Sequence, residues 1–190
     1  VIQSIKEDLT AFKVNFDHWF FESSLGSLSD SKSEISLAIQ KLQKNHTFEK
    51  DGAVWLESTK FGDDKDRVII REDGRGTYLS ADLVYHKNKL DRGFNTIINV
   101  WGSDHHGYIK RIEATIEAFG YKKQQMQVQL VQFANLFEDG MKVKMSTRSG
   151  NFYTLKQLID DIGPDASRFY YLSKQALSLI HISEPTRHSI

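Results

Sequence analysis

The amino-acid sequence predicts an α/β fold built on a parallel sheet. Three stretches that contain Val, Ile or Leu and lie between turn or helix signals are typical of strands, at residues 67–71, 95–101 and 127–133. Two helices are expected between them, at 78–92 and 106–119, and a glycine follows each one as a helix-ending signal. Strands that alternate with helices indicate parallel pairing, because a parallel connection needs a crossover segment.

The middle strand is nearly continuous in apolar residues from Asn95 to Trp101. A run of this kind is expected where a parallel strand is covered on both faces. We therefore expect this strand to be buried on both sides.

The segment before residue 67 is expected to combine helices with a hairpin. Apolar residues recur at helical spacing over 3–13 and 34–44, and Ser33 is suited to cap the second helix. Residues 47–56 predict a hairpin, because its central Asp51-Gly52 tolerates the positive φ angles of a tight turn.

Two further stretches of the chain carry expectations. The aromatic run 16–21 is expected to pack in the core. Helices are expected at 154–161 and 164–174, with Thr154 and Gly163-Pro164 as boundary signals.

The last segment, from Ala176 to Ile190, is expected to be a non-native tail. Its sequence, ALSLIHISEPTRHSI, abandons the preceding periodicity and resembles translated adaptor or vector sequence. The native chain is expected to continue differently after Gln175.

Composition excludes several classes of protein. Among 190 residues, 25 lysines and arginines balance 25 acidic residues, so overall charge does not favour non-specific nucleic-acid binding. With no cysteine, the chain has no disulfide, cysteine nucleophile or thiolate metal site. It has no apolar run of about 18 residues, no signal-peptide layout and no initiator methionine. We expect a cytoplasmic protein whose true start lies upstream.

The first candidate site is Gly102-Ser103-Asp104-His105-His106-Gly107, directly after a predicted strand. Ligands of open α/β sheets collect at the carboxyl ends of strands, and the following helix would offer free N–H groups. Asp104, His105 and His106 are candidates to hydrogen-bond a nucleotide. A metal site is the less favoured alternative, because neighbouring side chains diverge. Taken alone, the pattern is better explained by a capped helix start with one structural histidine.

The second candidate site is the loop from Lys142 to Asn151. Its three cations stand beside small hydroxyl residues and a glycine, a composition suited to a polyphosphate whose charge changes as pyrophosphate leaves. Composition leaves a solvated basic surface loop equally open.

The third candidate site is the pair Tyr78 and Asp82, which share one face of the predicted helix. A carboxylate beside a phenol suits a guanidinium, since the carboxylate can pair bidentately with its planar fork. Spacing alone favours an ordinary helix start with an exposed Asp82.

From about Val1 to Gln175 the chain resembles the arginyl-tRNA synthetases, since these patterns occur in that family's order and spacing. The version with one aspartate and two histidines is similar to the bacterial members. The resemblance is carried by an ordered set of phrases: Phe16-Asp17-His18-Trp19-Phe20-Phe21-Glu22-Ser23, Asp51-Gly52-Ala53-Val54-Trp55-Leu56, Phe61-Gly62-Asp63-Asp64-Lys65-Asp66-Arg67-Val68, Gly76-Thr77-Tyr78, Asp82-Leu83-Val84-Tyr85-His86, Gly102-Ser103-Asp104-His105-His106-Gly107-Tyr108, Met145-Ser146-Thr147-Arg148-Ser149-Gly150-Asn151 and Gly163-Pro164-Asp165-Ala166-Ser167-Arg168-Phe169.

The resemblance implies a class I synthetase with a partial Rossmann-type parallel sheet, the second half of the catalytic domain. Residues 1–175 would be this fragment, with an α+β insertion at about 22–66 near the acceptor end of tRNA. The parent enzyme would activate L-arginine with ATP to arginyl-adenylate and transfer the arginine to its tRNA. Its partners would be L-arginine, ATP with Mg²⁺ and an arginine-accepting tRNA, without a tightly bound cofactor or a membrane. The parent enzyme is expected to be a monomer.

The resemblance also implies residue roles. Tyr78 and Asp82 would bind the arginine guanidinium, and Ser103 would lie beside the bound amino acid. The ATP-binding residues would be Gly102, Asp104, His105, His106, Met145 and Ser146. The catalytic loop, this family's form of the KMSKS motif, would be Lys144, Met145, Ser146, Thr147 and Arg148. Thr147 stands where the usual motif has its second lysine, a replacement that also occurs in arginyl enzymes.

One part of the family's pattern is missing. Class I enzymes need a HIGH-type motif with two histidines three apart, and the histidines at 18, 46, 86, 105, 106, 181 and 188 include no such pair. We therefore expect the first strand of the nucleotide fold before Val1 and the anticodon-binding helices after Gln175. Half a nucleotide site lacks the convergent contacts of catalysis, so the chain alone is not expected to aminoacylate tRNA.

Two other interpretations remain open. One is a freestanding, non-catalytic synthetase-like module that binds a nucleotide or a partner. The other is a nucleotidyl transferase with a related fold. The sequence contains neither a G-x-x-x-x-G-K-[ST] loop nor a G-x-G-x-x-G motif.

Overall fold

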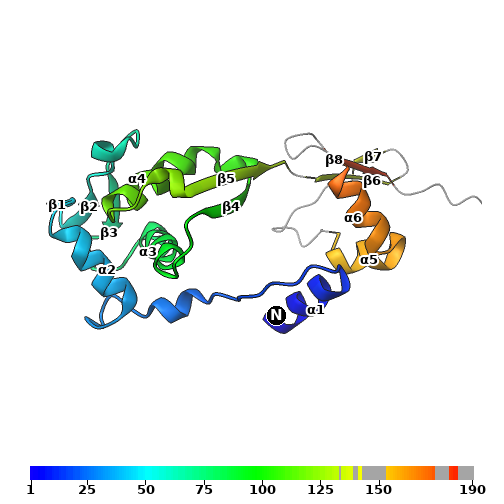
Figure 1. Ribbon diagram of the computed structural model, residues 1–190, viewed down its shortest axis with the longest axis horizontal. Coiled ribbons are helices and arrows are strands. Elements are labelled where there is room, and N and C mark those ends of the chain that lie inside the picture. The colour runs from blue at the N-terminus through cyan, green and yellow to red at the C-terminus, as the bar shows by residue number, and fades with distance from the viewer. Residues whose placement is uncertain (133, 139–140, 143–152, 174–179, 184–190) are drawn as a thin grey trace, which may run out of the picture. The chain divides into compact units, whose positions relative to one another are not determined.

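The computed structural model describes residues 1–132, 134–138, 141–142, 153–173 and 180–183 (Figure 1). The chain forms two compact units. One unit is continuous, Phe20–Gln129, and the other combines Val1–Trp19 with Leu130–Ile190. Within the described ranges, no helix has the length and apolar character that crossing a membrane requires.

The continuous unit contains an antiparallel sheet, a parallel strand pair and three α-helices. The antiparallel sheet has the order β1-β2-β3, and β4 and β5 form the parallel pair. Its strands and α-helices, in chain order, are α2 (Glu34–Gln43), β1 (Thr47–Lys50), β2 (Ala53–Leu56), β3 (Arg67–Ile70), α3 (Tyr78–Asp91), β4 (Ile97–Gly102), α4 (Ile109–Ala118) and β5 (Met126–Val131). Short 3₁₀ turns connect them: η1 (Glu22–Leu25), η2 (Ser58–Phe61), η3 (Ser103–Tyr108) and η4 (Lys123–Gln125).

The predicted hairpin and the second predicted helix are confirmed. Ser33 Oγ accepts a hydrogen bond from the Ser36 backbone N–H at 3.2 Å and so caps α2. In the hairpin, Asp51 has φ 51° and Gly52 has φ 73°, the left-handed pair that a two-residue turn requires.

The sequence-based assignment of the first parallel strand is wrong. Residues 67–70 do form strand β3, but it pairs antiparallel with β2, with Leu56 opposite Arg67. In the continuous unit, the parallel β-α-β arrangement therefore comprises β4, α4 and β5. The antiparallel sheet extends to Ile70, beyond the end predicted for the α+β insertion.

Strand β4 is covered on one face, not on both as its composition predicts. Ile97 and Asn99 are 6% and 5% exposed, whereas Ile98 and Val100 are 64% and 67% exposed. The alternation follows from the pleat, since successive side chains point to opposite faces of a strand. Within the described residues, packing reaches only one of those faces.

The start of helix α3 is tied to the end of the antiparallel sheet. Thr77 Oγ1 donates to the Val68 carbonyl at 3.0 Å, and the buried Ser80 Oγ donates to the Ile69 carbonyl. The first two turns of α3 also bury Leu79, Leu83 and Val84 in the core. These contacts fix where α3 begins.

The second unit contains the helices predicted at 3–13, 154–161 and 164–174. Its elements are α1 (Ile2–Ala11), β6 (Ala134–Glu138), β7 (Met141–Lys142), α5 (Leu155–Ile162), α6 (Pro164–Leu172) and β8 (Ile180–Ser183). Thr154 caps α5 in a reciprocal capping box with Gln157, as its position predicted. Arg168 of α6 donates to the carbonyls of Phe12 and Lys13, which anchors α6 to the end of α1. Strand β8, parallel to β6, lies in the predicted non-native tail, which stays a prediction.

The prediction that the aromatic run 16–21 packs in the core is confirmed only for Phe20, which is partly buried against the core cluster. Phe16 and Phe21 are 56% and 45% exposed, because the segment is an extended connection and the two units divide after Trp19. Phe16 lies edge-on to Trp19, with 5.5 Å between ring centroids, whereas Phe20 stacks on Tyr85 at 4.3 Å.

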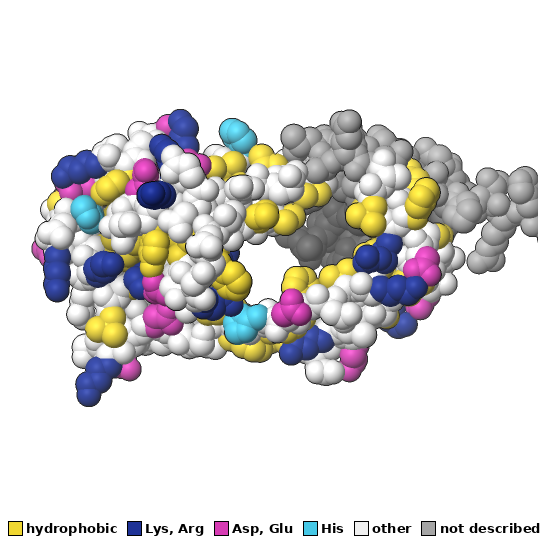
Figure 2. Space-filling view, viewed as in Figure 1, with side chains coloured by type: hydrophobic (Ala, Val, Ile, Leu, Met, Phe, Trp, Pro, Cys, Tyr) yellow, Lys and Arg dark blue, Asp and Glu magenta, His cyan; other side chains and the backbone are white. Residues whose placement is uncertain are grey.

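Surface charges of both signs are interspersed on the face shown in Figure 2. In contrast, Asp63 forms a buried bidentate pair with Arg67, whose Nε and Nη2 donate to the two carboxylate oxygens at 2.7 Å each. The side chain of Asp63 is 1% exposed, and that of Arg67 is 13% exposed. Burial acts to raise the pKa of Asp63, but the hydrogen bonds from Arg67 and the Asp64 N–H lower that pKa below its ordinary value.

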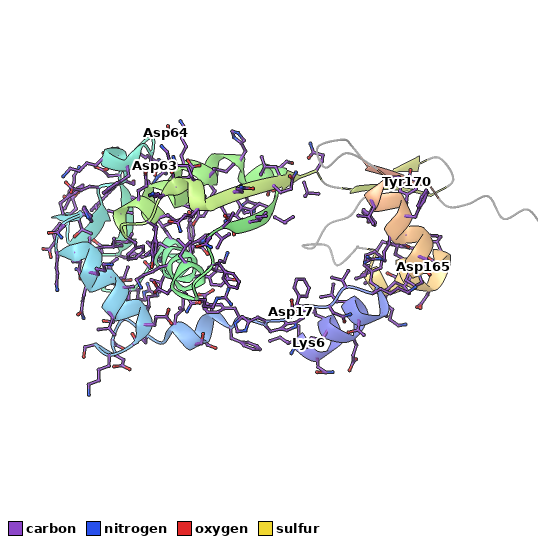
Figure 3. All side chains as sticks on the ribbon, viewed as in Figure 1. Lys6, Asp17, Asp63, Asp64, Asp165 and Tyr170 are labelled. Atoms are coloured by element: carbon purple, nitrogen blue, oxygen red, sulfur yellow. The ribbon has the colours of Figure 1, made fainter. Side chains whose placement is uncertain are left out.

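The Asp63–Arg67 pair gives a stability prediction with a neighbouring control. Asp63→Asn leaves the Arg67 guanidinium without its charge partner and should lower the free energy of unfolding by about 2–3 kcal/mol. Asp64→Asn should change it little, because Asp64 and its partner Lys110 are 72% and 61% exposed. Asp63 and Asp64 are adjacent in the chain and are labelled in Figure 3. Urea unfolding at pH 7 measures both variants, and equal effects would contradict the assignment.

Candidate functional site

The candidate site is a cleft of about 350 Å³ between α3 and the carboxyl end of β4. The carboxyl end of a parallel strand is where open α/β sheets collect their ligands. Its lining combines one carboxylate, aromatic rings and one ammonium: Asp82, Tyr85, His86, Lys89, Val100, Trp101, Gly102, His105 and Tyr108.

The carboxylate of Asp82 is held from the strand side of the cleft. Tyr108 Oη donates to Asp82 Oδ2 at 2.7 Å, which links the last residue of η3 to the second turn of α3. Burial, the hydrogen bond and the negative charge of Asp82 together raise the pKa of Tyr108. The hydroxyl therefore keeps its proton and stays a donor to Asp82.

Aromatic side chains surround this hydrogen bond. The Tyr108 ring centroid lies 6.0 Å from that of Trp101 and 6.4 Å from that of Tyr78. The Arg111 guanidinium lies 4.5 Å from the Tyr108 ring centroid, within the range of a cation–π contact. Arg111 already contacts the Tyr108 ring, so a further cation held by the fixed carboxylate would have Trp101 as its aromatic neighbour.

Tyr108 contacts both members of the predicted pair, Tyr78 and Asp82. The two residues stand one turn apart on α3, as their spacing predicted. Tyr78 is 69% exposed and is not among the residues that line the cleft. Tyr108, to which sequence reasoning gave no role, is the residue that contacts both side chains.

The segment after β4 is a 3₁₀ turn, so the expected α-helix begins at Ile109 instead of His106. Tight turns of this kind are frequent where an α-helix starts. Gly102 and His105 line the cleft, whereas Asp104 and His106 are exposed outside it. Ser103 is the first residue of the turn.

A buried chain of polar side chains lies along the cleft. Lys89 Nζ donates to Asn99 Oδ1 at 2.8 Å, Asn99 Nδ2 donates to His86 Nε2 at 3.0 Å, and His86 Nδ1 donates to the Asp82 carbonyl at 2.7 Å. Burial, with the nearby charge of Lys89, lowers the pKa of His86 to about 4. Burial, with the charge of Arg92, lowers the pKa of Lys89 to about 8.

Sequence reasoning missed this polar chain. Its one available signal was Asn99, a polar residue inside a strand that otherwise reads as apolar. An isolated amide in such a strand requires a hydrogen-bonding partner, because buried polar groups are nearly always paired.

One predicted site, and the less favoured metal alternative, remain to be considered. The predicted phosphate loop, Lys144, Met145, Ser146, Thr147 and Arg148, lies outside the described residues. In the part of the chain that the structure describes, no three His, Asp or Glu side chains lie close enough together to hold a metal ion.

The comparisons with known proteins agree with one another. A family model described as "tRNA synthetases class I (R), catalytic domain" matches residues 2–177. The arginine–tRNA ligase of Oceanobacillus iheyensis is 52% identical over 173 residues, which are 91% of this chain and 31% of that protein. The arginine–tRNA ligase of Bacillus subtilis is 47% identical over 176 residues, 92% of this chain and 31% of that protein. The chain therefore spans about a third of the length of these relatives.

Solved structures show the same likeness. A crystal structure described as an arginyl tRNA synthetase from Campylobacter jejuni superposes with a TM-score of 0.85 at 39% identity, over 96% of this chain and 39% of that one. The Thermus thermophilus arginyl-tRNA synthetase has a TM-score of 0.70 at 14% identity, over 94% and 39% of the two chains, which is a likeness of fold.

The buried His86 gives a pH prediction. Its pKa is about 4 in the folded chain and 6.5 when unperturbed, so below pH 6.5 the unfolded chain binds the proton more tightly. The free energy of unfolding should therefore fall as pH drops from 6.5 to about 4, by about 2 kcal/mol from this group between pH 7 and pH 5. Urea unfolding at the two pH values should show a smaller loss in His86→Gln than in the parent chain. The same loss in both proteins would refute the assignment of this pH dependence to His86.

Proposed function

Since the chain belongs to the family of class I arginyl-tRNA synthetase catalytic domains, we propose that it supplies the arginine-binding half of an arginine–tRNA ligase active site. The observation that carries this proposal is the Asp82 carboxylate, fixed by Tyr108 at an aromatic cleft beyond the end of β4. The parent enzyme activates L-arginine with ATP and passes the arginyl group to its tRNA.

The guanidinium of arginine matches the chemistry of the cleft. Its planar fork can donate two parallel hydrogen bonds to a carboxylate, and it is weakly enough hydrated to stack on aromatic faces. The Tyr108 hydrogen bond takes one acceptor position on Asp82 Oδ2, and an ionised carboxylate has about four. Both carboxylate oxygens therefore remain available to a guanidinium.

Tyr78 stands at the exposed side of the same helix face, where its ring or hydroxyl can add a contact to the bound side chain. Ser103 begins the turn that follows β4 and is proposed to lie beside the bound amino acid. A lysine substrate presents a compact ammonium that cannot make the bidentate contact, so the pair Asp82 and Tyr108 favours arginine.

The ATP site is proposed to lie at Gly102, Asp104, His105 and His106, with Met145 and Ser146. Lys144, Thr147 and Arg148 complete the loop over the phosphates, where cations offset the charge that develops as pyrophosphate leaves. Magnesium accompanies the ATP, the parent enzyme is a cytoplasmic monomer, and residues of about 22–66 form the insertion near the acceptor end of tRNA.

The chain should bind a stable arginyl-adenylate analogue and should reject the lysyl analogue. At 100 times its dissociation constant, the arginyl compound should raise the free energy of unfolding by about 2.7 kcal/mol, seen as a higher melting temperature. Asp82→Ala should abolish the shift because it removes the carboxylate, whereas the exposed Asp64→Ala should keep it. A cooperative melt with no shift, or an equal shift with the lysyl compound, would count against arginine recognition by this chain.

Tyr108→Phe isolates the hydroxyl that holds Asp82. The variant keeps the ring and its aromatic contacts but loses the donor, so the dissociation constant of the arginyl analogue should rise about 3- to 10-fold. Tyr121→Phe is a matched control, since its hydroxyl donates to Asp91 and lies outside the cleft lining. Isothermal titration calorimetry measures both variants; equal affinities would remove Tyr108 from the site.

A further inference from the structure

The polar chain Lys89–Asn99–His86 connects two elements that both contribute to the cleft. Lys89 and His86 stand on α3, and Asn99 stands on β4. His86 is one turn after Asp82, and Asn99 is two residues before Trp101 on the same face of the strand. These hydrogen bonds therefore join the part of α3 that carries Asp82 to the part of β4 that carries Trp101.

Each hydrogen bond in this chain has only one possible direction. The Asp82 carbonyl can only accept, so His86 Nδ1 carries the proton and the Nε2 of the neutral ring must accept. Asn99 must then turn its NH₂ toward His86, which leaves Oδ1 to accept from the Lys89 ammonium. Any other arrangement of the neutral imidazole and the amide would place donor against donor or acceptor against acceptor.

Packing alone does not require these polar residues. His86 and Asn99 are 4% and 5% exposed, and well-packed apolar side chains at such positions are often as stable or more stable. What a fully satisfied polar chain adds is a single geometry, because sliding α3 along β4 would leave buried donors and acceptors unpaired. The face of the Tyr85 ring, 4.2 Å from Lys89 Nζ, gives the ammonium a second contact.

We propose that His86 and Asn99 are positioning residues that hold the Asp82 carboxylate at a fixed place relative to the Trp101 and Tyr108 side of the cleft. This inference rests on the proposed function for its ligand, but the geometry it describes exists without any ligand. The two can therefore be tested separately.

The first experiment uses Asn99→Asp, which replaces the donating amide with a carboxylate that can only accept. His86 must then carry a second proton to keep its hydrogen bond, so ¹⁵N spectra of the histidine-labelled chain at pH 6 should change from a neutral Nδ1–H ring to a doubly protonated one. Asn95→Asp makes the same chemical change at an exposed position four residues earlier and should leave His86 neutral.

The same samples report on Asp82. Its side-chain carboxyl ¹³C resonance, assigned by its loss in Asp82→Asn, should move in Asn99→Asp and stay in place in Asn95→Asp. An Asp82 resonance that does not respond to Asn99→Asp would overturn the proposal, whether or not the chain binds arginine.

The second experiment separates positioning from stability. In the double variant His86→Leu/Asn99→Leu both buried partners become apolar, so neither is left unpaired, and Lys89 can extend its ammonium to solvent. The melting temperature should stay within a few degrees of the parent's, while the dissociation constant of the arginyl-adenylate analogue rises about tenfold, equivalent to about 1.4 kcal/mol. Unchanged affinity in a folded double variant would show that the polar chain is structural only, and would overturn the proposal.

The pattern of outcomes also separates the two hypotheses. If the parent chain fails to bind the arginyl analogue, the proposed function fails, and the response of the Asp82 resonance to Asn99→Asp still decides the positioning role. His86→Gln, whose amide can both donate and accept, should recover part of the affinity that His86→Leu/Asn99→Leu loses.

Discussion

The attachment of helix α3 to strand β3 is the constraint on which the candidate site depends. Thr77 and Ser80 hydrogen-bond the carbonyls of Val68 and Ile69, so the helix can begin only where β3 ends. The apolar side chains of its first two turns then face the core, which directs Asp82 toward β4. The place of each α3 side chain in the cleft is therefore set by where the helix begins.

Burial beside α3 also determines which groups of the cleft carry a charge. Burial keeps His86 neutral and lowers the pKa of Lys89 to about 8, while Asp82 receives a hydrogen bond from a hydroxyl that keeps its proton. A neutral imidazole beside the carboxylate, in place of an imidazolium, leaves the Asp82 charge available to an incoming cation.

Local signals in the sequence were sufficient for most elements. The Asp51-Gly52 turn, the Ser33 and Thr154 caps and Gly93 after α3 each act within a few residues, so each could be read without the fold. The family resemblance assigned roles to Asp82 and to the turn after β4, again from short stretches of sequence. Short-range patterns thus identified the helices, and the assignment of Asp82 to the site stays a prediction.

Contacts between residues far apart in the sequence could not be predicted from local patterns. Strand β3 looks like β4 in composition, yet it pairs antiparallel with β2, because the choice of partner depends on the hairpin that precedes it. Tyr108 contacts Asp82 across 26 positions, and Asn99 contacts His86 across 13, so neither appears as a periodic pattern. The residues that fix the carboxylate are therefore those that composition and spacing could not find.

Under the proposed function, the position of Tyr108 relates these separate contacts to selectivity for a guanidinium. Its hydroxyl is committed to Asp82, and the Arg111 guanidinium lies over its ring. Because a cation already contacts that ring, a further bound guanidinium would depend mainly on the carboxylate and on Trp101. Recognition then rests on the angle at which Asp82 presents its two oxygens, since a planar fork requires both and an ammonium requires only one. Tyr108 sets that angle from the β4 side and the His86–Asn99 contact holds α3 against β4, so the helix, the strand and the turn after it act on one carboxylate.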